Sequence, residues 1–596
     1  MKPTTEILDR ISENSRNNKE EIFTRLYRYM LRPDLYYTAY KNLYANKGAS
    51  TKGVDDDTAD GFSAEKISRI ICSLVDETYT PKPVRREYIQ KKRNSAKKRP
   101  LGIPTFTDKL VQEVLRMILE AVYEPTFSNY SHGFRPSRSC HTALKSLKKE
   151  FAGATWFVEG DIKGCFDNID HHVLVDIIGS KIKDARLIKL IWRFLKAGYM
   201  EDWTYHKTYS GCPQGGIVSP ILSNIYLNEL DKFAAKMAME FFKPKDKVRS
   251  AEYGKIVGKR DYAKKLLKIA SGQRKAELLK EIKVLTSQLH KVPYSPKTDK
   301  VMKYIRYADD FIIGVKGDKA DCELIKLQFS EFISHALKME LSDEKTLITH
   351  SNQYARFLGY DVRVRREQKL KPHGNHLART LNNTVELNVP FADKIMPFLF
   401  DKLAIRQNHN GAIEPAPRKY LYRCTDLEII SSYNSELRGI CNYYGIASNF
   451  TRLDYFAYLM EYSCLKTLAG KHGTTSRKMI DKYHIKNGGW GIPYNTVKRK
   501  KCREFARYQD CKNADSFNDV IINFGARHAG MTTTIEQRLS AEVCELCGKT
   551  DVPLEIHHVN KVKNLKGKQD WEIVMIAKKR KTLAVCKGCH HKIHHP

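Results

Sequence analysis

Two adjacent aspartates, Asp309 and Asp310, lie between two apolar runs just past the middle of the chain. Residues 303–306 combine polar and apolar side chains and residues 311–313 are apolar, so the pattern predicts two strands joined by a tight connection. Adjacent carboxylates at such a tip can hold divalent cations at a phosphoryl-transfer centre, where two ions roughly 4 Å apart act on the attacking and leaving oxygens. Taken alone, two aspartates in a solvated turn are common, so other motifs must support this interpretation.

A third carboxylate, Asp161, stands at the end of another apolar run, residues 156–160, and Phe166 follows five positions later. An aspartate that leaves a strand, followed by a bulky aromatic, resembles the palm of a reverse transcriptase. There the aromatic lies under the sugar of the incoming nucleotide and excludes a 2′-hydroxyl, the group that distinguishes ribose from deoxyribose. Phe166 alone would be read as a core residue, and only the joint pattern favours the sugar contact.

Residues 209–220 supply a proline and glycine loop that opens a helix-like segment, with Gln214 in the loop. Glycine permits close backbone approach, and a helix N-terminus favours negative charge, so a templating base and an incoming triphosphate fit this position. Upstream, residues 88–104 form a basic hairpin. Lys91 and Arg99 are its candidates for gripping the triphosphate, whose charge must be neutralised during transfer, although a solvated basic face explains each one equally simply.

In this order, the segments resemble the motifs of bacterial group II intron-encoded proteins, and they are close to those of the lactococcal-type members that carry a C-terminal endonuclease. The resemblance continues through residues 341–346 and 356–360. It implies a multidomain α+β fold with a right-hand reverse transcriptase, an α-helical thumb or domain X, a basic DNA-binding segment and a ββα-metal HNH endonuclease. It also implies Mg²⁺ at Asp161, Ile162, Asp309 and Asp310, with Lys345 near the departing pyrophosphate as a general acid.

The resemblance and the changes in composition divide the chain into five parts. We expect an N-terminal extension over residues 1–60, fingers and palm over 61–365, the thumb and maturase region over 366–490, a DNA-binding domain over 491–540 and the endonuclease over 541–596. Within the palm, residues around 240–300 are charged and helical in pattern. This segment predicts a solvated helical hairpin without chemistry.

In the thumb region, aromatic and cationic residues recur at helical spacing, as expected for a surface that contacts phosphates and stacks on unpaired bases. Arg438, Lys466 and Lys471 are the candidates for RNA binding. For Tyr443 and Tyr444, packing in the core is at least as good an interpretation as base stacking.

Two Cys-x-x-Cys pairs near the C-terminus, Cys544 with Cys547 and Cys586 with Cys589, have the spacing of a tetrahedral Zn²⁺ site. The segment is too short to rely on an apolar core, so metal binding would supply folding energy. A pair of disulfides is the alternative, which a reducing compartment disfavours.

Between and after these pairs, the histidines of residues 555–558 and 589–594 resemble the HNH nuclease motif. That resemblance makes His558 the general base, a role suited to a group titrating near neutral pH. It assigns the divalent ion to His557 and His590, with His594 as a further ligand. A purely structural zinc cluster remains the alternative.

One position departs from the nuclease motif. Where many HNH nucleases have a middle asparagine, this chain has Lys581 or Thr582, so the sequence does not assign the orientation of the His558 ring.

Composition favours a polyanionic partner, since 103 Lys and Arg against 68 Asp and Glu give a formal net charge of +35. A basic run at residues 498–501 suits phosphate contacts or a solvated linker about equally. The sequence contains no apolar run long enough to span a bilayer, and its cysteines are mostly scattered. We therefore expect a cytoplasmic protein without a membrane partner, and the resemblance implies that it acts as a ribonucleoprotein on chromosomal or plasmid DNA.

The resemblance implies a protein that binds its intron RNA and assists splicing, nicks target DNA and copies the intron into cDNA by target-primed reverse transcription. Its partners would be intron RNA, target DNA and dNTPs, with a homodimer on the RNA as one form of the complex. A reverse transcriptase of a retron or diversity-generating element is the first alternative, and domain X with an HNH tail argues against it. An RNA-folding cofactor with a vestigial polymerase is the second, and intact Asp161, Asp309 and Asp310 argue against that.

Overall fold

The computed structural model describes residues 4–90, 98–202, 204–212, 215–244, 249–289, 292, 294, 299–367, 370–374, 376–379, 382–485, 489–495, 500–512 and 534–595. Lys91 and Gln214, both predicted to contact the nucleotide, lie outside these ranges. The same is true of residues 513–533 and of half of the basic run, residues 498 and 499.

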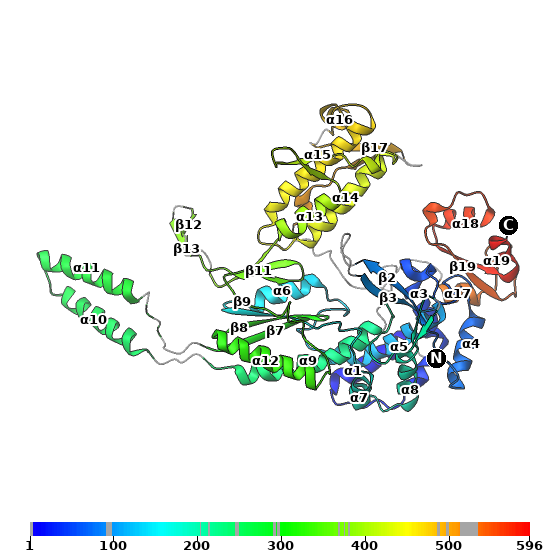
Figure 1. Cartoon of the computed structure of the whole chain (residues 1–596), viewed down its shortest axis with the longest axis horizontal. Helices are drawn as coiled ribbons and strands as arrows, with labels where there is room; N and C mark the ends of the chain where they lie inside the picture. Colours follow the sequence, from blue (N-terminus) through cyan, green and yellow to red (C-terminus); the bar gives the residue numbers. More distant parts are fainter. Residues whose placement is uncertain are drawn as a thin grey trace.

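The chain forms an elongated molecule in which the palm lies between two projecting parts (Figure 1). A helical hairpin extends from one end, and the C-terminal segment lies beside the N-terminal helices at the other. A mainly helical domain stands over the palm. No helix in the described part of the chain has the length and apolarity that crossing a membrane requires.

The palm is built on a four-stranded sheet of order β7-β8-β4-β9. Its strands are β4 (Trp156–Asp161), β7 (Val301–Tyr307), β8 (Asp310–Lys316) and β9 (Ile348–His350). Successive side chains of a strand point to opposite faces, so β8 buries Phe311 and Ile313 in one core cluster and Ile312 in another. The first cluster includes residues of α9 (Ser219–Phe241) and α12 (Lys319–His335), and the second includes residues of α6 (Cys140–Glu150) and the thumb.

The fingers contain a second four-stranded sheet, of order β3-β2-β5-β6. Its strands are β2 (Val84–Gln90), β3 (Lys98–Ile103), β5 (Tyr199–Glu201) and β6 (Thr204–His206). The long helix α5 (Phe106–Tyr123) is buried along most of its length and packs against the N-terminal helices. The other helices of this part are α1 (Thr4–Asn17), α2 (Tyr27–Met30), α3 (Pro33–Leu43), α4 (Ala64–Val75), α7 (His171–Lys181) and α8 (Ala185–Leu195).

The insertion predicted around residues 240–300 is a pair of packed helices, α10 (Ala251–Leu267) and α11 (Gly272–Leu289). Only four of their side chains are buried, those of Ala263, Leu278, Leu285 and Leu289. The prediction of a solvated helical hairpin is therefore confirmed, and Figure 1 shows it projecting away from the palm.

The thumb region contains α13 (Met396–Asp401), α14 (Asp426–Tyr443), α15 (Leu453–Lys471) and α16 (Ser476–Tyr483). Helix α14 begins at a capping box. The Thr425 side chain accepts a hydrogen bond from the Glu428 amide, and the Glu428 side chain accepts one from the Thr425 amide. Two strands at the end of the palm, β10 (Ala355–Phe357) and β11 (Tyr360–Val364), lead into this region. Its own strands are β12 (Leu370–His373), β13 (His376–Arg379), β14 (Val385–Asn388), β15 (Ile405–Gln407) and β16 (Ile413–Pro415), and β17 (Gly491–Asn495) and β18 (Lys500–Glu504) follow it.

The C-terminal segment has the strand, strand and helix order that the nuclease motif predicts. It contains α17 (Ile535–Ser540), β19 (Leu554–His558), α18 (Asp570–Lys578), β20 (Thr582–Cys586) and α19 (Lys587–His594). Its sheet also includes a strand from the other end of the chain, because β1 (Phe62–Ser63) pairs antiparallel with β19. Apolar residues of this segment belong to the same core cluster as the N-terminal helices. The segment thus packs on the start of the chain and shares its apolar core.

Candidate polymerase, zinc and nuclease sites

Strand register brings two of the three predicted catalytic carboxylates together. Asp161 is the last residue of β4, Asp310 is the first of β8, and the two are direct partners in the antiparallel pairing. Asp309 occupies the turn before β8, next to Ala308, whose φ of 56° is in the left-handed region. The turn fits closely against the fingers, since a Cβ on Gly133 would lie 2.3 Å from the Ala308 nitrogen.

The three carboxylates crowd one another electrostatically. Burial raises the pKa of Asp309. The pKa of Asp310 is raised to about 7 by burial, by a hydrogen bond to Asp161 and by the negative charges of Asp309 and Asp161. Lys345 Nζ donates to Asp161 Oδ2 over 2.6 Å, and this bond raises the pKa of the lysine. An all-oxygen donor set with excess negative charge is suited to Mg²⁺.

The Lys345 loop is held against the end of β4 by the main chain. Ile162, predicted to contribute to the Mg²⁺ site, pairs with Leu341, and the Ser342 amide donates to Asp161 O over 2.8 Å. These bonds place the predicted general acid beside the carboxylates.

The predicted sugar contact lies where three sequence-distant segments meet. The half-buried Phe166 ring contacts Phe134 edge-on, with centroids 6.0 Å apart. The Cys212 amide donates to Phe166 O over 2.7 Å. A Cβ on Gly211 would lie 2.6 Å from Asp167 O, which explains the glycine at this close approach.

The basic hairpin lies beside the same loop. A Cβ on Gly215 would lie 2.6 Å from Gly102 O of β3, so the loop contacts this strand directly. Arg99 is exposed on β3, opposite Ile89, and its charge acts against the rise in the pKa of Asp309. The hairpin therefore places the positive charge of Arg99 near enough to act on the Asp309 carboxylate.

The three candidates for RNA binding differ in their surroundings. Arg438 is exposed on α14. Lys466 Nζ donates to Pro415 O over 2.9 Å, and Lys471 Nζ contacts Asp426 Oδ1 over 2.6 Å and Cys424 O over 2.8 Å. The two lysine ammonium groups thus already bind the chain's own oxygens, whereas Arg438 faces solvent.

Tyr443 and Tyr444 pack between the thumb and the palm. Their hydroxyls donate to Leu358 O and Gly359 O respectively, and both rings contact the ring of Tyr360. The packing interpretation of the two tyrosines fits these observations.

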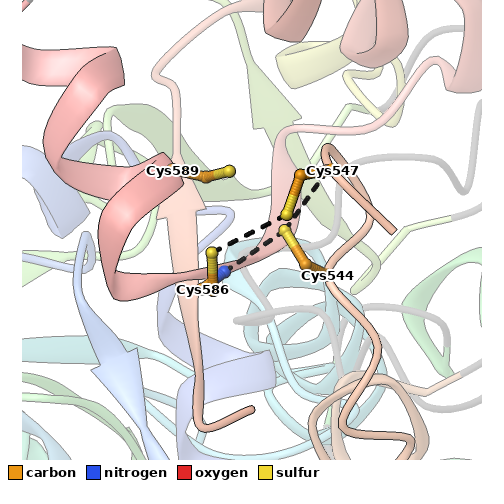
Figure 2. Close-up of side chains that lie close together, drawn as sticks. All are labelled: Cys544, Cys547, Cys586 and Cys589. Atoms are coloured by element: carbon orange, nitrogen blue, oxygen red, sulfur yellow. Dashed lines mark hydrogen bonds between the residues drawn. The ribbon is translucent and has the colours of Figure 1, made fainter. Parts of the chain in front are cut away.

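The four C-terminal cysteine sulfurs converge, as Figure 2 shows, and lie within 4.8 Å of one another. All 14 cysteines of the chain are free thiols. The Sγ atoms of Cys547 and Cys586 are 3.9 Å apart, close to the separation of about 3.8 Å that tetrahedral Zn–S bonds of 2.3 Å require.

One of these thiols is prepared for metal binding by its main-chain neighbours. Burial opposes ionisation of Cys544, but amide donors, among them those of Cys547 and Cys586, lower its pKa to about 6. The thiolate is the ligating form, so these amides favour the state that binds zinc.

A second group of candidate metal ligands comprises Asp60, His557, His590 and His594, whose ligating atoms also lie within 4.8 Å of one another. The three histidines, which come from β19 and α19, are those that the resemblance proposes as ligands. Asp60, which lies in the turn just before β1, was not predicted. No local signal in the sequence marks it, because its partners lie about 500 residues further along the chain.

Hydrogen bonds fix the His590 ring. Its Nδ1 lies 2.7 Å from Glu555 Oε2, which directs Nε2 toward Asp60 and His594. Burial lowers the pKa of His590, but the bonds to Asp60 and Glu555 outweigh it and raise the pKa to about 9.

The predicted general base, His558, is oriented by a carbonyl. Its Nε2 lies 2.9 Å from Tyr44 O, and a carbonyl can only accept, so Nε2 carries the proton and Nδ1 the lone pair. Thr582 lies opposite His558 in the strand register, while Lys581 donates to Ala45 O. The orientation left open by the sequence is thus set by Tyr44, outside the nuclease segment.

These sites and folds define a reverse transcriptase joined to a maturase domain and an HNH endonuclease. Residues 89–247 match the reverse transcriptase (RNA-dependent DNA polymerase) family, residues 382–527 the type II intron maturase family, and residues 544–590 the AI2M/AI1M-like HNH endonuclease family.

Relatives match along the whole chain. The chain is 59% identical to the group II intron-encoded protein LtrA of Lactococcus lactis subsp. cremoris, over 100% of both chains. It is 34% identical to a 91 kDa protein in the cob intron of Schizosaccharomyces pombe, over 98% of this chain and 72% of that protein. It is 32% identical to the putative COX1/OXI3 intron 2 protein of Saccharomyces cerevisiae, over 98% of this chain and 68% of that protein. The chain belongs to the family of group II intron-encoded proteins.

Membership of this family, with all three domains present, defines the activities. The protein is an RNA-directed DNA polymerase and a DNA endonuclease with a maturase function, and these activities serve intron splicing and mobility. The predicted fold class and function are confirmed.

Proposed function

We propose that Asp161, Asp309 and Asp310 form the polymerase centre that copies intron RNA into cDNA, with Mg²⁺ as the cofactor. The observation that carries this proposal is the register of β4 and β8, which makes Asp161 and Asp310 direct partners beside Asp309. When bound there, Mg²⁺ would lower the barrier to phosphoryl transfer by stabilising charge on the reacting oxygens.

The surrounding side chains have separate roles in this proposal. Arg99 and Lys91 neutralise the triphosphate, and Gln214 contacts the nucleotide. Phe166 lies under the sugar and excludes the 2′-hydroxyl. Lys345, held 2.6 Å from Asp161, gives its proton to the departing pyrophosphate.

The nuclease uses a different set of residues. His557, His590 and His594 hold a divalent ion that would neutralise charge on the scissile phosphate. His558 accepts the proton of the attacking water at Nδ1, because its Nε2 is occupied by Tyr44 O. Cys544, Cys547, Cys586 and Cys589 hold a structural Zn²⁺, whose ligands are separate from the histidines.

The proposed partners follow from the family and the charge. Intron RNA, target DNA and dNTPs are the substrates and partners, and a net charge of +35 suits the two polyanions. Arg438, Lys466 and Lys471 belong to the RNA-binding region, with a homodimer as one form of the complex on RNA. We place the ribonucleoprotein in the cytoplasm, where it reaches chromosomal or plasmid DNA.

The test compares nicking of a target duplex with zinc content in two variants. His558→Ala should stop nicking and keep its zinc, since it removes a base and no zinc ligand. Cys586→Ala should lose zinc, thermal stability of the C-terminal segment and nicking together. Normal nicking by His558→Ala would refute the base assignment, and zinc loss in that variant would make His558 a structural ligand.

A further inference from the structure

Asp60 enters the nuclease histidine cluster from the start of the chain. The antiparallel pairing of β1 with β19 fixes its position, with the Gly61 amide donating to Ile556 O over 3.0 Å. The His558 amide donates to Asp60 Oδ1 over 2.6 Å. The carboxylate is therefore held by main-chain bonds to the nuclease strand, independently of the histidine side chains.

The distances within the cluster resemble those among ligands of one ion. Asp60 Oδ2 lies 3.2 Å from His590 Nε2, and His590 Nε2 lies 3.3 Å from His594 Nε2. Tetrahedral bonds of 2.0–2.1 Å place donor atoms about 3.3–3.4 Å apart. The distance from Asp60 Oδ2 to His594 Nε2 is shorter, at 2.7 Å. Binding both atoms to one ion therefore requires a small adjustment of the exposed His594 side chain.

His557 provides an independent sign of a missing partner. Its side chain is 4% exposed, and neither ring nitrogen has a hydrogen-bond partner. Its Nδ1 lies 3.2 Å from Asp60 Oδ1 without the alignment of a hydrogen bond. Leaving a buried polar ring unsatisfied is costly, and an ion beside Asp60 would satisfy the nitrogen that faces it.

The remaining bonds prepare the site for an ion. Glu555 accepts from His590 Nδ1 over 2.7 Å, an outer carboxylate that leaves Nε2 free to ligate. Three imidazoles and one carboxylate suit borderline divalent cations such as Mn²⁺ or Zn²⁺.

We propose that Asp60 is a ligand of the nuclease ion, so that the ion is shared between the N-terminal region and the C-terminal nuclease. This rests on the proposed function, in which His557, His590 and His594 hold that ion. An ion that binds only the docked arrangement stabilises docking by mass action. The nuclease therefore acquires its complete metal site only when it is docked on the N-terminal region.

The test measures metal binding directly. The full-length protein carries Asp309→Ala and Asp310→Ala, so that the polymerase carboxylates do not take up the probe. It is loaded with one equivalent of Zn²⁺, enough for the four-cysteine site alone, and free Mn²⁺ is followed by its paramagnetic resonance signal. Asp60→Asn is expected to weaken Mn²⁺ binding by about 10-fold or more, the scale of the effect of removing even an outer-sphere partner.

Glu65→Gln is the matched control. Glu65 Oε2 lies 2.8 Å from Lys587 Nζ across the same interface, and Glu65 is outside the ligand cluster. This variant removes an interface carboxylate and is expected to bind Mn²⁺ as tightly as the parent protein. Equal weakening in Glu65→Gln and Asp60→Asn would show a general effect on docking and overturn the assignment of Asp60 as a ligand.

A second measurement needs no change at Asp60. If the ion bridges the two regions, Mn²⁺ should slow hydrogen exchange of the Gly61 and His558 amides relative to a chelator. Unchanged exchange rates of these two amides in the presence of bound Mn²⁺ would contradict an ion that bridges the two regions.

His590→Ala separates failure of this inference from failure of the nuclease site itself. If His590→Ala loses Mn²⁺ and Asp60→Asn binds it normally, the histidine site stands and Asp60 is only an ion-pair partner. If both variants bind Mn²⁺ normally, the proposed nuclease ion site also fails.

Discussion

Arg306 Nη2 lies 2.6 Å from Asp231 Oδ2, and both side chains are 1% exposed. The arginine Nε also donates to Asp231 Oδ1, over 2.8 Å, which makes the pair bidentate. A third bond, from Arg306 Nη1 to Ala308 O over 2.9 Å, reaches the turn that carries Asp309. The buried pair thus connects α9 to the catalytic turn.

Asp231→Ala should destabilise the palm by about 3–5 kcal/mol, because it leaves a buried guanidinium without its counter-ion. The measurement is the urea midpoint of the transition that includes the palm. Glu340→Ala is the control, since its pair with Lys163 is exposed at both ends and should contribute at most about 1 kcal/mol. Equal effects of the two substitutions would show that the buried pair does not support the turn.

Mg²⁺ affinity of the polymerase centre should rise with pH through about 7. Burial and the neighbouring carboxylates raise the pKa of Asp310 to about 7, so below that pH the group is protonated, and binding the cation must displace a proton. Calorimetric titration with Mg²⁺ between pH 6 and 8 checks this, and Asp310→Asn should bind weakly with little pH dependence. A wild-type affinity that is flat across this range would contradict the assignment.

Phe166→Val should increase incorporation of ribonucleotides relative to deoxyribonucleotides, because the smaller side chain leaves room for a 2′-hydroxyl. Single-nucleotide primer extension with each substrate gives the ratio. Phe134→Val is a useful comparison, since Phe134 contacts Phe166 edge-on and should affect the ratio less. Retained activity with an unchanged ratio in Phe166→Val would make Phe166 a packing residue.

Arg438→Ala should weaken intron RNA binding and reduce the dependence of affinity on salt, by about one unit of slope or less for each phosphate that the protein no longer neutralises. Its thermal stability should be unchanged, because Arg438 is exposed. Lys471→Ala should instead lower stability, since it breaks the 2.6 Å ion pair with Asp426. Filter binding at several salt concentrations and thermal denaturation separate the two effects. Unchanged RNA affinity in Arg438→Ala would move the RNA-binding surface elsewhere.

Local sequence patterns predicted the strands around Asp309 and Asp310, the helical hairpin and the Cys-x-x-Cys pairs, because periodicity and short spacing are properties of neighbouring residues. The partnership of Asp161 with Asp310 depends on register between strands far apart in the chain. The order of the motifs along the chain can suggest that Asp161 and Asp310 pair, but the strand propensities of the residues within β4 and β8 do not specify the register.

The positions of Asp60 and Tyr44 beside the nuclease histidines could not be predicted from the sequence. Both reach the nuclease site because β1 pairs with β19 and because the C-terminal segment shares its core with the N-terminal helices. Neither interaction has a local signature, and the segment boundaries expected from composition assigned these residues to a separate N-terminal extension. The helical pattern that predicts RNA binding by Lys466 and Lys471 likewise does not specify the chain's own oxygens, to which their ammonium groups donate.

Target-primed cDNA synthesis by the intron ribonucleoprotein tests most directly whether polymerase and nuclease are two independent centres on one chain. The assay follows nicking of a target duplex and extension of the new 3′ end separately. The variant with both Asp309→Ala and Asp310→Ala should splice and nick but make no cDNA. His558→Ala should not nick, yet it should extend a primer supplied with a free 3′ end. Extension by the double variant, or loss of extension from a supplied primer in His558→Ala, would contradict this account.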